Sequence, residues 1–218
     1  MRLILASASP RRAELLRAAG FEFDVAVTDV DESIRAGESP QAYVRRLAAD
    51  KSLAALKGCA TGADDARQET AVAQAFRPAD VIILGADTAV VVDGDILGKP
   101  RDDQDAAAML RRLSGRRHEV MTGVSLRCGA YEVGRVEVTS VEFARLADDD
   151  IEWYVKSGEG RDKAGAYAIQ GLASRFIPRI EGSYSNVVGL PVACVAELLR
   201  EISSTRPARS SPSRSAAD

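Results

Sequence analysis

VIILGADTAVVVDGDILGKPRD, residues 81–102, predicts a buried strand with one acid in its middle. The apolar runs Val81–Leu84 and Ala89–Val92 indicate a strand covered on both faces. Asp87 lies between them, and a carboxylate there is costly to desolvate. It should therefore face a cation, a metal ion or a set of hydrogen-bond donors. The alternative is a bulge at Gly85-Ala86, with Asp87 bonded to nearby backbone.

Composition limits the chemistry that can accompany this acid. The chain has 218 residues, of which 46% are hydrophobic, and a net charge of −3, so nothing draws it generally to nucleic acid or acidic membranes. No apolar run approaches transmembrane length, and the chain begins with a strand pattern where a signal peptide would stand. Three scattered cysteines and a single histidine favour a cytoplasmic protein and argue against zinc, disulfides and a Ser-His-Asp triad. Catalysis must then depend on carboxylates, Lys, Arg and a bound ion.

The beginning of the chain predicts an anion site. A short strand at Leu3–Ala6 leads into a helix whose N-cap is Ser9. Backbone N–H groups at such a helix start attract anions. Arg11 and Arg12 lie in the first turn, where they oppose the helix dipole, so a bound phosphate explains them better than helix stability does. The alternative is two solvated arginines on a surface turn.

Two lysines are further candidates for binding phosphate. A strand is expected at Phe21–Val30, and a helix from Ser39-Pro40 to about Leu56 carries Lys51 on its apolar stripe. Lys51 must meet an anion or extend its ammonium outward to water. Lys99 follows a hairpin in a stretch that fails the P-loop pattern but still offers a point charge.

The second half of the chain adds antiparallel strands and a glycine-rich loop. Long strands are expected at Glu119–Arg127 and Tyr131–Leu146, with a bulge near Thr139-Ser140, and a further strand at Phe176–Ile180. The loop contains Gln170, whose amide can pair with a base edge. Residues 1–202 are expected to form a single α/β domain, with a variable excursion at 58–78 and a disordered tail at 203–218.

Several of these stretches, taken together, resemble the Maf, or septum-formation, family of nucleotide pyrophosphatases. The matching pieces are, in order, Leu5–Arg12, Lys51, Gly85–Thr88 with Gly98–Pro100, Asp162–Gly171 and Gly182–Pro191. The resemblance implies a long, bent mixed sheet with helices and two lobes around a deep cleft, as in the inosine-triphosphate pyrophosphatases. It also implies hydrolysis of nucleoside triphosphates to the monophosphate and pyrophosphate with a divalent cation, Mg²⁺ or Mn²⁺, and a homodimer.

The resemblance assigns roles to individual residues. Asp87 would be the proton acceptor, and Glu32 and Asp87 would hold the metal. Ser7, Arg12, Lys51 and Lys99 would bind the phosphates. Arg11, Thr88 and Gln170 match the positions that set base preference, and they resemble the branch that acts on dTTP and UTP. The branch that acts on 7-methyl-GTP has an acid in place of Gln170.

Three other functions stay open at this point. The protein could act on 7-methyl-GTP, or it could be a regulator of cell division that senses nucleotides without turnover. It could also bind nucleic acid through its arginine-bearing tail, which is short and lacks aromatic residues. The first reading, a dTTP and UTP pyrophosphatase without stable nucleic-acid or membrane partners, agrees best with an isolated acid among cationic positions.

Overall fold

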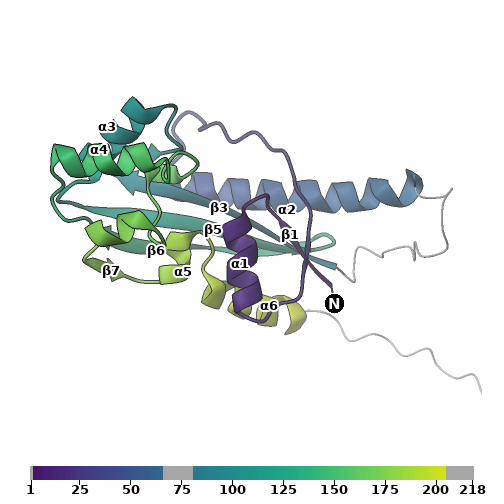
Figure 1. Ribbon diagram of the computed structural model, residues 1–218. Helices are drawn as coiled ribbons and strands as arrows, with labels where there is room; N and C mark the ends of the chain where they lie inside the picture. The colour runs from purple at the N-terminus through teal and green to yellow at the C-terminus, as the bar shows by residue number, and fades with distance from the viewer. Residues whose placement is uncertain (1, 66–80, 205–218) are drawn as a thin grey trace, which may run out of the picture.

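The computed structural model describes residues 2–65 and 81–204, which form one mixed sheet with helices on both faces (Figure 1). The strand order is β2-β1-β3-β5-β6-β7, with β4 paired to β3. β1 is parallel to β2 and β3, while the pairs from β3 through β7 are antiparallel. The strands are β1 (Arg2–Ala6), β2 (Asp24–Val25), β3 (Val81–Val92), β4 (Asp95–Leu97), β5 (Arg117–Cys128), β6 (Tyr131–Glu142) and β7 (Arg179–Glu181).

The helices cover the sheet unevenly. The long helix α2 runs along one face over β3 and β5, and α1 and α6 pack on the opposite face (Figure 1). α3 and α4 lie together at the other end of the sheet over a separate core. The helices are α1 (Pro10–Ala18), α2 (Pro40–Asp65), α3 (Asp103–Leu113), α4 (Asp148–Ser157), α5 (Tyr184–Val188) and α6 (Val192–Ser204), with short 3₁₀ turns at Ala164–Ala166 and Leu172–Phe176. The expected mixed α/β fold is confirmed.

The side chains of the central strand β3 point alternately to the two faces of the sheet, so this strand contacts the helices of both layers. Ile82, Leu84 and Ala86 join the core under α1 and α6. Its odd-numbered residues point toward α2, so Asp87 faces that helix and Thr88 the opposite side. The register against β5 is unbroken from Ile83 to Val91, which excludes the alternative of a bulge at Gly85-Ala86.

Two glycines let α2 lie close to the sheet. A Cβ on Gly85 would come 2.2 Å from the carbonyl oxygen of Ala48, and one on Gly123 would come 2.1 Å from that of Val44. The helix backbone therefore rests on the sheet where these strands carry no side chain. This contact places the side chain of Lys51 directly beside β3.

Several predicted boundaries are wrong. The strand expected at Phe21–Val30 reduces to β2, because only two residues pair with β1 and the chain then leaves the sheet. The strand expected at Phe176–Ile180 begins only at Arg179, after a 3₁₀ turn, and the one expected to reach Leu146 ends at Glu142.

The bulge predicted near Thr139-Ser140 is also wrong. Val120 pairs with Thr139 and Glu119 with Ser140 in continuous register. Thr139 occupies an inward position although it is polar, and its hydroxyl accepts a hydrogen bond from Asn186 Nδ2 at 2.9 Å. Thr139 thus interrupts the alternation of apolar residues in the sequence without interrupting the strand, because its buried hydroxyl has a hydrogen-bond partner.

Two helices extend beyond their predicted ends. α2 continues to Asp65 through the first part of the segment expected to be a variable excursion, and residues 66–78 of that segment lie outside the described residues. α6 ends at Ser204, so the predicted tail loses its first two residues to the helix; the rest of it, 205–218, also lies outside the described residues.

Candidate active site

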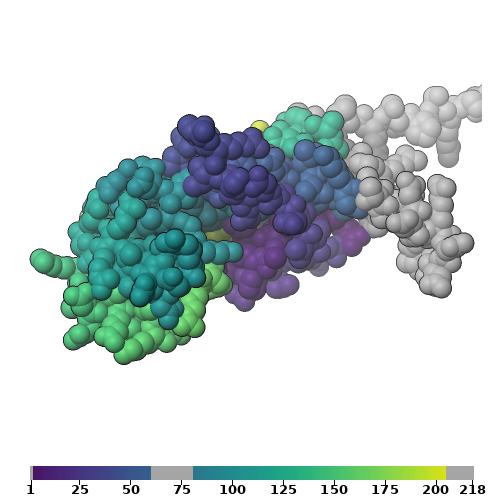
Figure 2. Space-filling model, turned by 90° about the horizontal axis from the view of Figure 1, so that it is seen from above, coloured from purple at the N-terminus to yellow at the C-terminus, as the bar shows by residue number. Residues whose placement is uncertain are grey.

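A cavity of about 610 Å³ opens between the N-terminal segment and the end of the sheet that carries α3 and α4. Seen from above, that end is teal and green, whereas the N-terminal segment is purple and the chain that leads into α2 is indigo (Figure 2). All the residues predicted for the site line this cavity: Ser7, Arg11, Arg12, Glu32, Lys51, Asp87, Thr88, Lys99 and Gln170.

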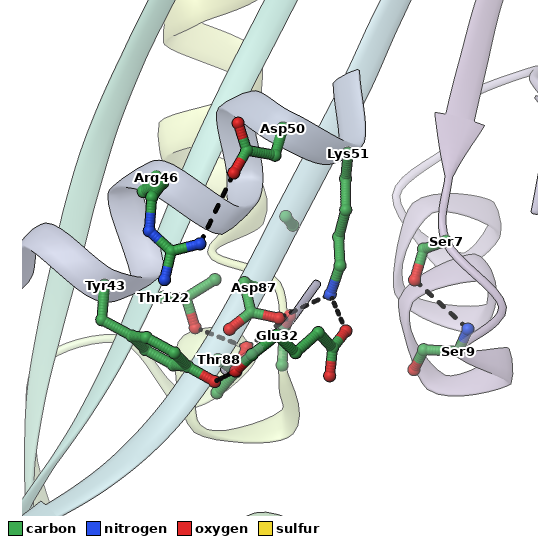
Figure 3. Close-up of polar contacts among 12 residues, drawn as sticks. Ser7, Ser9, Glu32, Tyr43, Arg46, Asp50, Lys51, Asp87, Thr88 and Thr122 are labelled. Carbon is green, nitrogen blue, oxygen red and sulfur yellow. Dashed lines mark hydrogen bonds and ion pairs between the residues drawn. The ribbon is translucent and has the colours of Figure 1, made fainter. Parts of the chain in front are cut away.

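Lys51 joins two carboxylates inside the cavity. Its ammonium donates to Asp87 Oδ1 at 2.6 Å and lies 2.7 Å from Glu32 Oε1 (Figure 3). Lys51 and Asp87 are 8% and 7% exposed, so the lysine points inward and the alternative of an outward ammonium is wrong. Burial opposes ionisation of Glu32, but the hydrogen bond and charge of Lys51 outweigh it and lower the pKa of that carboxyl.

Arg12 is a buried cation that holds the cavity wall together. Its Nε donates to the carbonyl of Gly189 at 2.8 Å, and its Nη1 donates to the carbonyl of Ala86 at 2.9 Å and to Ser7 Oγ at 3.1 Å. Its Nη2 donates to Thr88 Oγ1 at 3.1 Å. Desolvation lowers the pKa of this guanidinium, and the negative charge of Asp87 partly offsets the effect. Among residues 2–65 and 81–204, partners are found for four of its five N–H groups, which leaves one for a ligand.

The start of α1 is arranged by Ser7. Ser9 occupies the N-cap position with extended backbone, as predicted, but its side chain makes no capping hydrogen bond. Its backbone N–H donates to Ser7 Oγ at 3.2 Å, and the same oxygen accepts from Arg12. The helix start and the buried arginine are therefore linked by a single hydroxyl.

Thr88, one of the three positions predicted to read the base, lies on the other side of β3 from Asp87. The Thr88 hydroxyl lies 2.9 Å from Thr122 Oγ1 and donates to the carbonyl of Gly189 at 3.2 Å, besides accepting from Arg12. Arg11 Nη1 lies 3.5 Å from Asp162 Oδ2, at the start of the loop that carries the exposed Gln170.

Comparison with known proteins identifies the family. A sequence model of the family described as Maf-like protein matches residues 2–202. The chain belongs to the Maf family. A relative from Anaeromyxobacter dehalogenans (strain 2CP-C), named dTTP/UTP pyrophosphatase, is 49% identical over 91% of this chain and 93% of its own.

Two more relatives agree with this Maf assignment. Proteins of the same name from Hahella chejuensis and Vibrio cholerae are 48% and 47% identical, each over 92% of this chain and over 92% and 97% of their own. The solved structure of the Staphylococcus aureus Ham1 protein aligns with a TM-score of 0.43 at 12% identity, over 94% of this chain and 98% of its own, which is too distant to carry an argument. Within the part of this Maf chain that the structure describes, no helix has the length and apolar character needed to span a bilayer.

The structure adds site residues that sequence reasoning missed. Tyr43 lines the cavity, and its hydroxyl donates to the carbonyl of Glu32 at 3.0 Å. Burial, together with the charges of Asp87 and Glu32, raises the pKa of Tyr43 to about 12. Its position two helical turns before Lys51 on the same stripe was the available signal. Lys163 also lines the cavity, with Nζ 2.5 Å from Asp162 Oδ1. It lies in the Asp162–Gly171 stretch that the sequence marked, but no role was assigned to it.

The residues of this Maf site fit a divalent cation that binds together with phosphate. Glu32 and Asp87 converge on one ammonium, so their oxygens face the same small volume. Among residues 2–65 and 81–204, no group of three or more His, Cys, Asp and Glu side chains is placed to hold a metal ion. Mg²⁺ typically takes one or two carboxylates and completes its shell with water and substrate phosphates. Glu32 and Asp87 lie in the same cavity as Arg12 and Lys99, which can bind phosphate, so the site matches this mode of Mg²⁺ binding.

Proposed function

We propose that this Maf protein hydrolyses dTTP and UTP to the nucleoside monophosphate and pyrophosphate. The observation that carries the proposal is the buried 2.6 Å salt bridge between Asp87 and Lys51, in a cavity that Arg12 and Lys99 also line. The names of the relatives indicate dTTP and UTP as the substrates. The positively charged side chains of the cavity can bind the triphosphate of such a nucleotide.

Positive side chains and one acid divide the work of the reaction. Arg12, Lys51 and Lys99 offset the negative charge of the triphosphate, which otherwise repels an incoming water. Asp87 orients that water and accepts its proton as the oxygen bonds to the α-phosphorus and the bond to the pyrophosphate oxygen breaks. A divalent cation held by Glu32 and Asp87 would supply further charge neutralisation at the phosphates.

The opposite wall would select the base. Arg11 can donate to a pyrimidine edge, and Gln170 can both donate to it and accept from it, while Thr88 has its hydroxyl occupied by the protein. Gln170, where the resemblance places an acid in the 7-methyl-GTP branch, favours the pyrimidine branch. The cytoplasmic location and the homodimer stay predictions from the sequence.

A substrate panel tests the proposal. The purified protein is incubated with Mg²⁺ or Mn²⁺ and, separately, dTTP, UTP, CTP, GTP and 7-methyl-GTP, and both pyrophosphate and monophosphate are measured. We expect turnover of dTTP and UTP well above the others. Preferred turnover of 7-methyl-GTP would contradict the base assignment, and tight binding without any monophosphate would favour the nucleotide-sensing regulator.

A further inference from the structure

The segment that carries Glu32, residues 31–38, lies between β2 and α2 and has no regular secondary structure. It runs beside α2 (Figures 1 and 2), and we call it the Glu32 segment. A metal-binding carboxylate on such a segment needs an outside anchor, because site geometry must be held to a fraction of an ångström. The anchor is on α2.

Arg46 links α2 to the Glu32 segment through three hydrogen bonds. Its Nε and Nη2 donate to the two oxygens of Glu38 at 2.6 and 2.8 Å, and Nη2 also donates to the carbonyl of Ser33 at 3.0 Å. The side chains of Arg46 and Glu38 are only 13% and 9% exposed. Arg46 and Glu38 thus form a bidentate salt bridge, which fixes the orientation of the two side chains as well as the distance between them.

The segment is fixed from its own side as well. Glu38 Oε2 accepts from the backbone N–H of Arg35 at 3.1 Å, so the acid that receives Arg46 also closes the turn. Arg46 packs over the ring of Tyr43, with 5.6 Å between the guanidinium carbon and the ring centre. The Tyr43 hydroxyl in turn holds the carbonyl of Glu32 at 3.0 Å. Tyr43 therefore holds the backbone of Glu32 itself, and Arg46 holds Ser33 and Glu38, which follow it.

We propose that Arg46 is a positioning residue that sets Glu32 in the active site through Glu38 and Ser33. Arg46 does not line the cavity, so it acts on the reaction through the Glu32 segment. The inference rests on the proposed role of Glu32 in holding a divalent cation. Loss of an outer-shell partner of a metal ligand typically costs about 10–100-fold in metal affinity or activity.

A double-mutant cycle tests the link. kcat/KM for dTTP is measured for wild type, Arg46→Met, Glu32→Gln and the double variant, with Arg45→Met as the matched control. Arg45 is the next residue of α2 but pairs with Glu132 on β6, away from the Glu32 segment. We expect Arg46→Met to lower kcat/KM about 10–100-fold in wild type and less than about 2-fold in the Glu32→Gln background. Arg45→Met should stay within about 2-fold of wild type.

Hydrogen exchange of the free protein supplies a readout that does not depend on turnover. Amides of residues 31–38 should exchange faster in Arg46→Met and unchanged in Arg45→Met. If Arg46→Met fails to fold, Glu38→Gln and Arg46→Lys replace it with the same expectation, because each weakens the bidentate salt bridge.

Three results would overturn the proposal. They are equal losses from Arg46→Met with and without Glu32, unchanged exchange in residues 31–38, and equal effects of Arg45→Met. A fully active Glu32→Gln would contradict the proposed role of Glu32 itself. In that event, faster exchange in Arg46→Met would still show that the anchor exists, so the two failures are distinguishable.

Discussion

Asp87 and Thr88 are neighbours in β3, and the strand sends them to opposite faces. Asp87 meets Lys51 and, through it, Glu32, whereas Thr88 meets Arg12, Thr122 and the carbonyl of Gly189. One dipeptide thus separates the acid that would handle the water from the wall that would read the base. We therefore expect a change at Thr88 to leave the Asp87–Lys51 pair in place.

His118 is a buried residue outside the cavity whose ionisation is coupled to stability. Burial lowers its pKa to about 4, and its Nε2 lies 2.8 Å from the Tyr167 hydroxyl. The folded state therefore favours the neutral ring, while the unfolded chain binds a proton near pH 6.5. The stabilisation is complete above pH 6.5 and is lost as the pH falls toward 4.

The pH dependence of unfolding checks this. Between pH 6.5 and 4.5 the loss of this contribution should lower the free energy of unfolding by about 2 kcal/mol in wild type, with a slope that approaches about 1.4 kcal/mol per pH unit. The chain has one histidine, and carboxyls with a lowered pKa, such as Glu38 at about 2, lose most of their contribution below pH 4.5. In His118→Gln, urea unfolding should show most of this slope removed. An unchanged slope would contradict the assignment.

Individual site residues could be predicted from the sequence where a charged residue interrupts an apolar pattern. Asp87 in an apolar run and Lys51 on an apolar stripe both stood out, and both lie in the cavity. Tyr43 did not stand out, because a tyrosine on a helix is ordinary. Arg46 was equally unremarkable, since its partner Glu38 lies in a segment whose path only the folded chain determines.

At the scale of elements, α2 decides where the site forms. It contacts β3 and β5 at Gly85 and Gly123, where any Cβ would meet helix backbone. That close contact fixes the distance from Lys51 to Asp87. The same helix supplies Tyr43 and Arg46 to the Glu32 segment, so a shift of α2 would disturb both carboxylates at once.

Replacing Gly85 by alanine should therefore be costly. Because the added carbon would lie 2.2 Å from Ala48 O, α2 must move, and we expect a loss of about 3 kcal/mol in the free energy of unfolding. Gly58→Ala, a second substitution within α2, is the control, because its added Cβ would have no atom within 4 Å. It should raise the free energy of unfolding by no more than about 1 kcal/mol. Urea denaturation measures both. Equal effects would show that close packing does not hold α2.

Elements with strong periodic or capping signals were predictable, and weakly paired ones were not. β1, β3 and β5 lie close to their expected positions. In α3, Asp102 is the N-cap and accepts from the Asp105 N–H. β2 and β7 are short because each pairs along only two or three residues at the sheet edge. Pairing partners at an edge depend on the assembled sheet, so local apolar pattern overestimates such strands.

At the scale of the whole molecule, Arg12 ties together segments that are far apart in the sequence. From α1 it donates to the carbonyl of Ala86 in β3 and to that of Gly189 in the turn between α5 and α6. A lysine cannot reach all of these acceptors at once. The N-terminal layer and the C-terminal helices thus share one buried charge at the cavity wall.

Arg12→Lys should consequently lower the free energy of unfolding by about 3 kcal/mol, since a buried acceptor left without a donor costs about 1–3 kcal/mol. Arg11→Lys is the matched control. Arg11 has a 3.5 Å ion pair with a largely exposed Asp162, so its replacement should cost less than about 0.5 kcal/mol. Denaturant unfolding of the two variants distinguishes the roles. A comparable loss in both would contradict the bridging role of Arg12.

The role of Asp87 as the general base is tested by the release of pyrophosphate from dTTP by Asp87→Asn with Mg²⁺ present. Lys51 keeps Glu32 as a partner in this variant, so the fold should survive, as circular dichroism can verify. We expect a turnover about 10²–10⁴-fold below wild type, the usual contribution of a general base. A folded Asp87→Asn protein with turnover close to wild type would contradict that role.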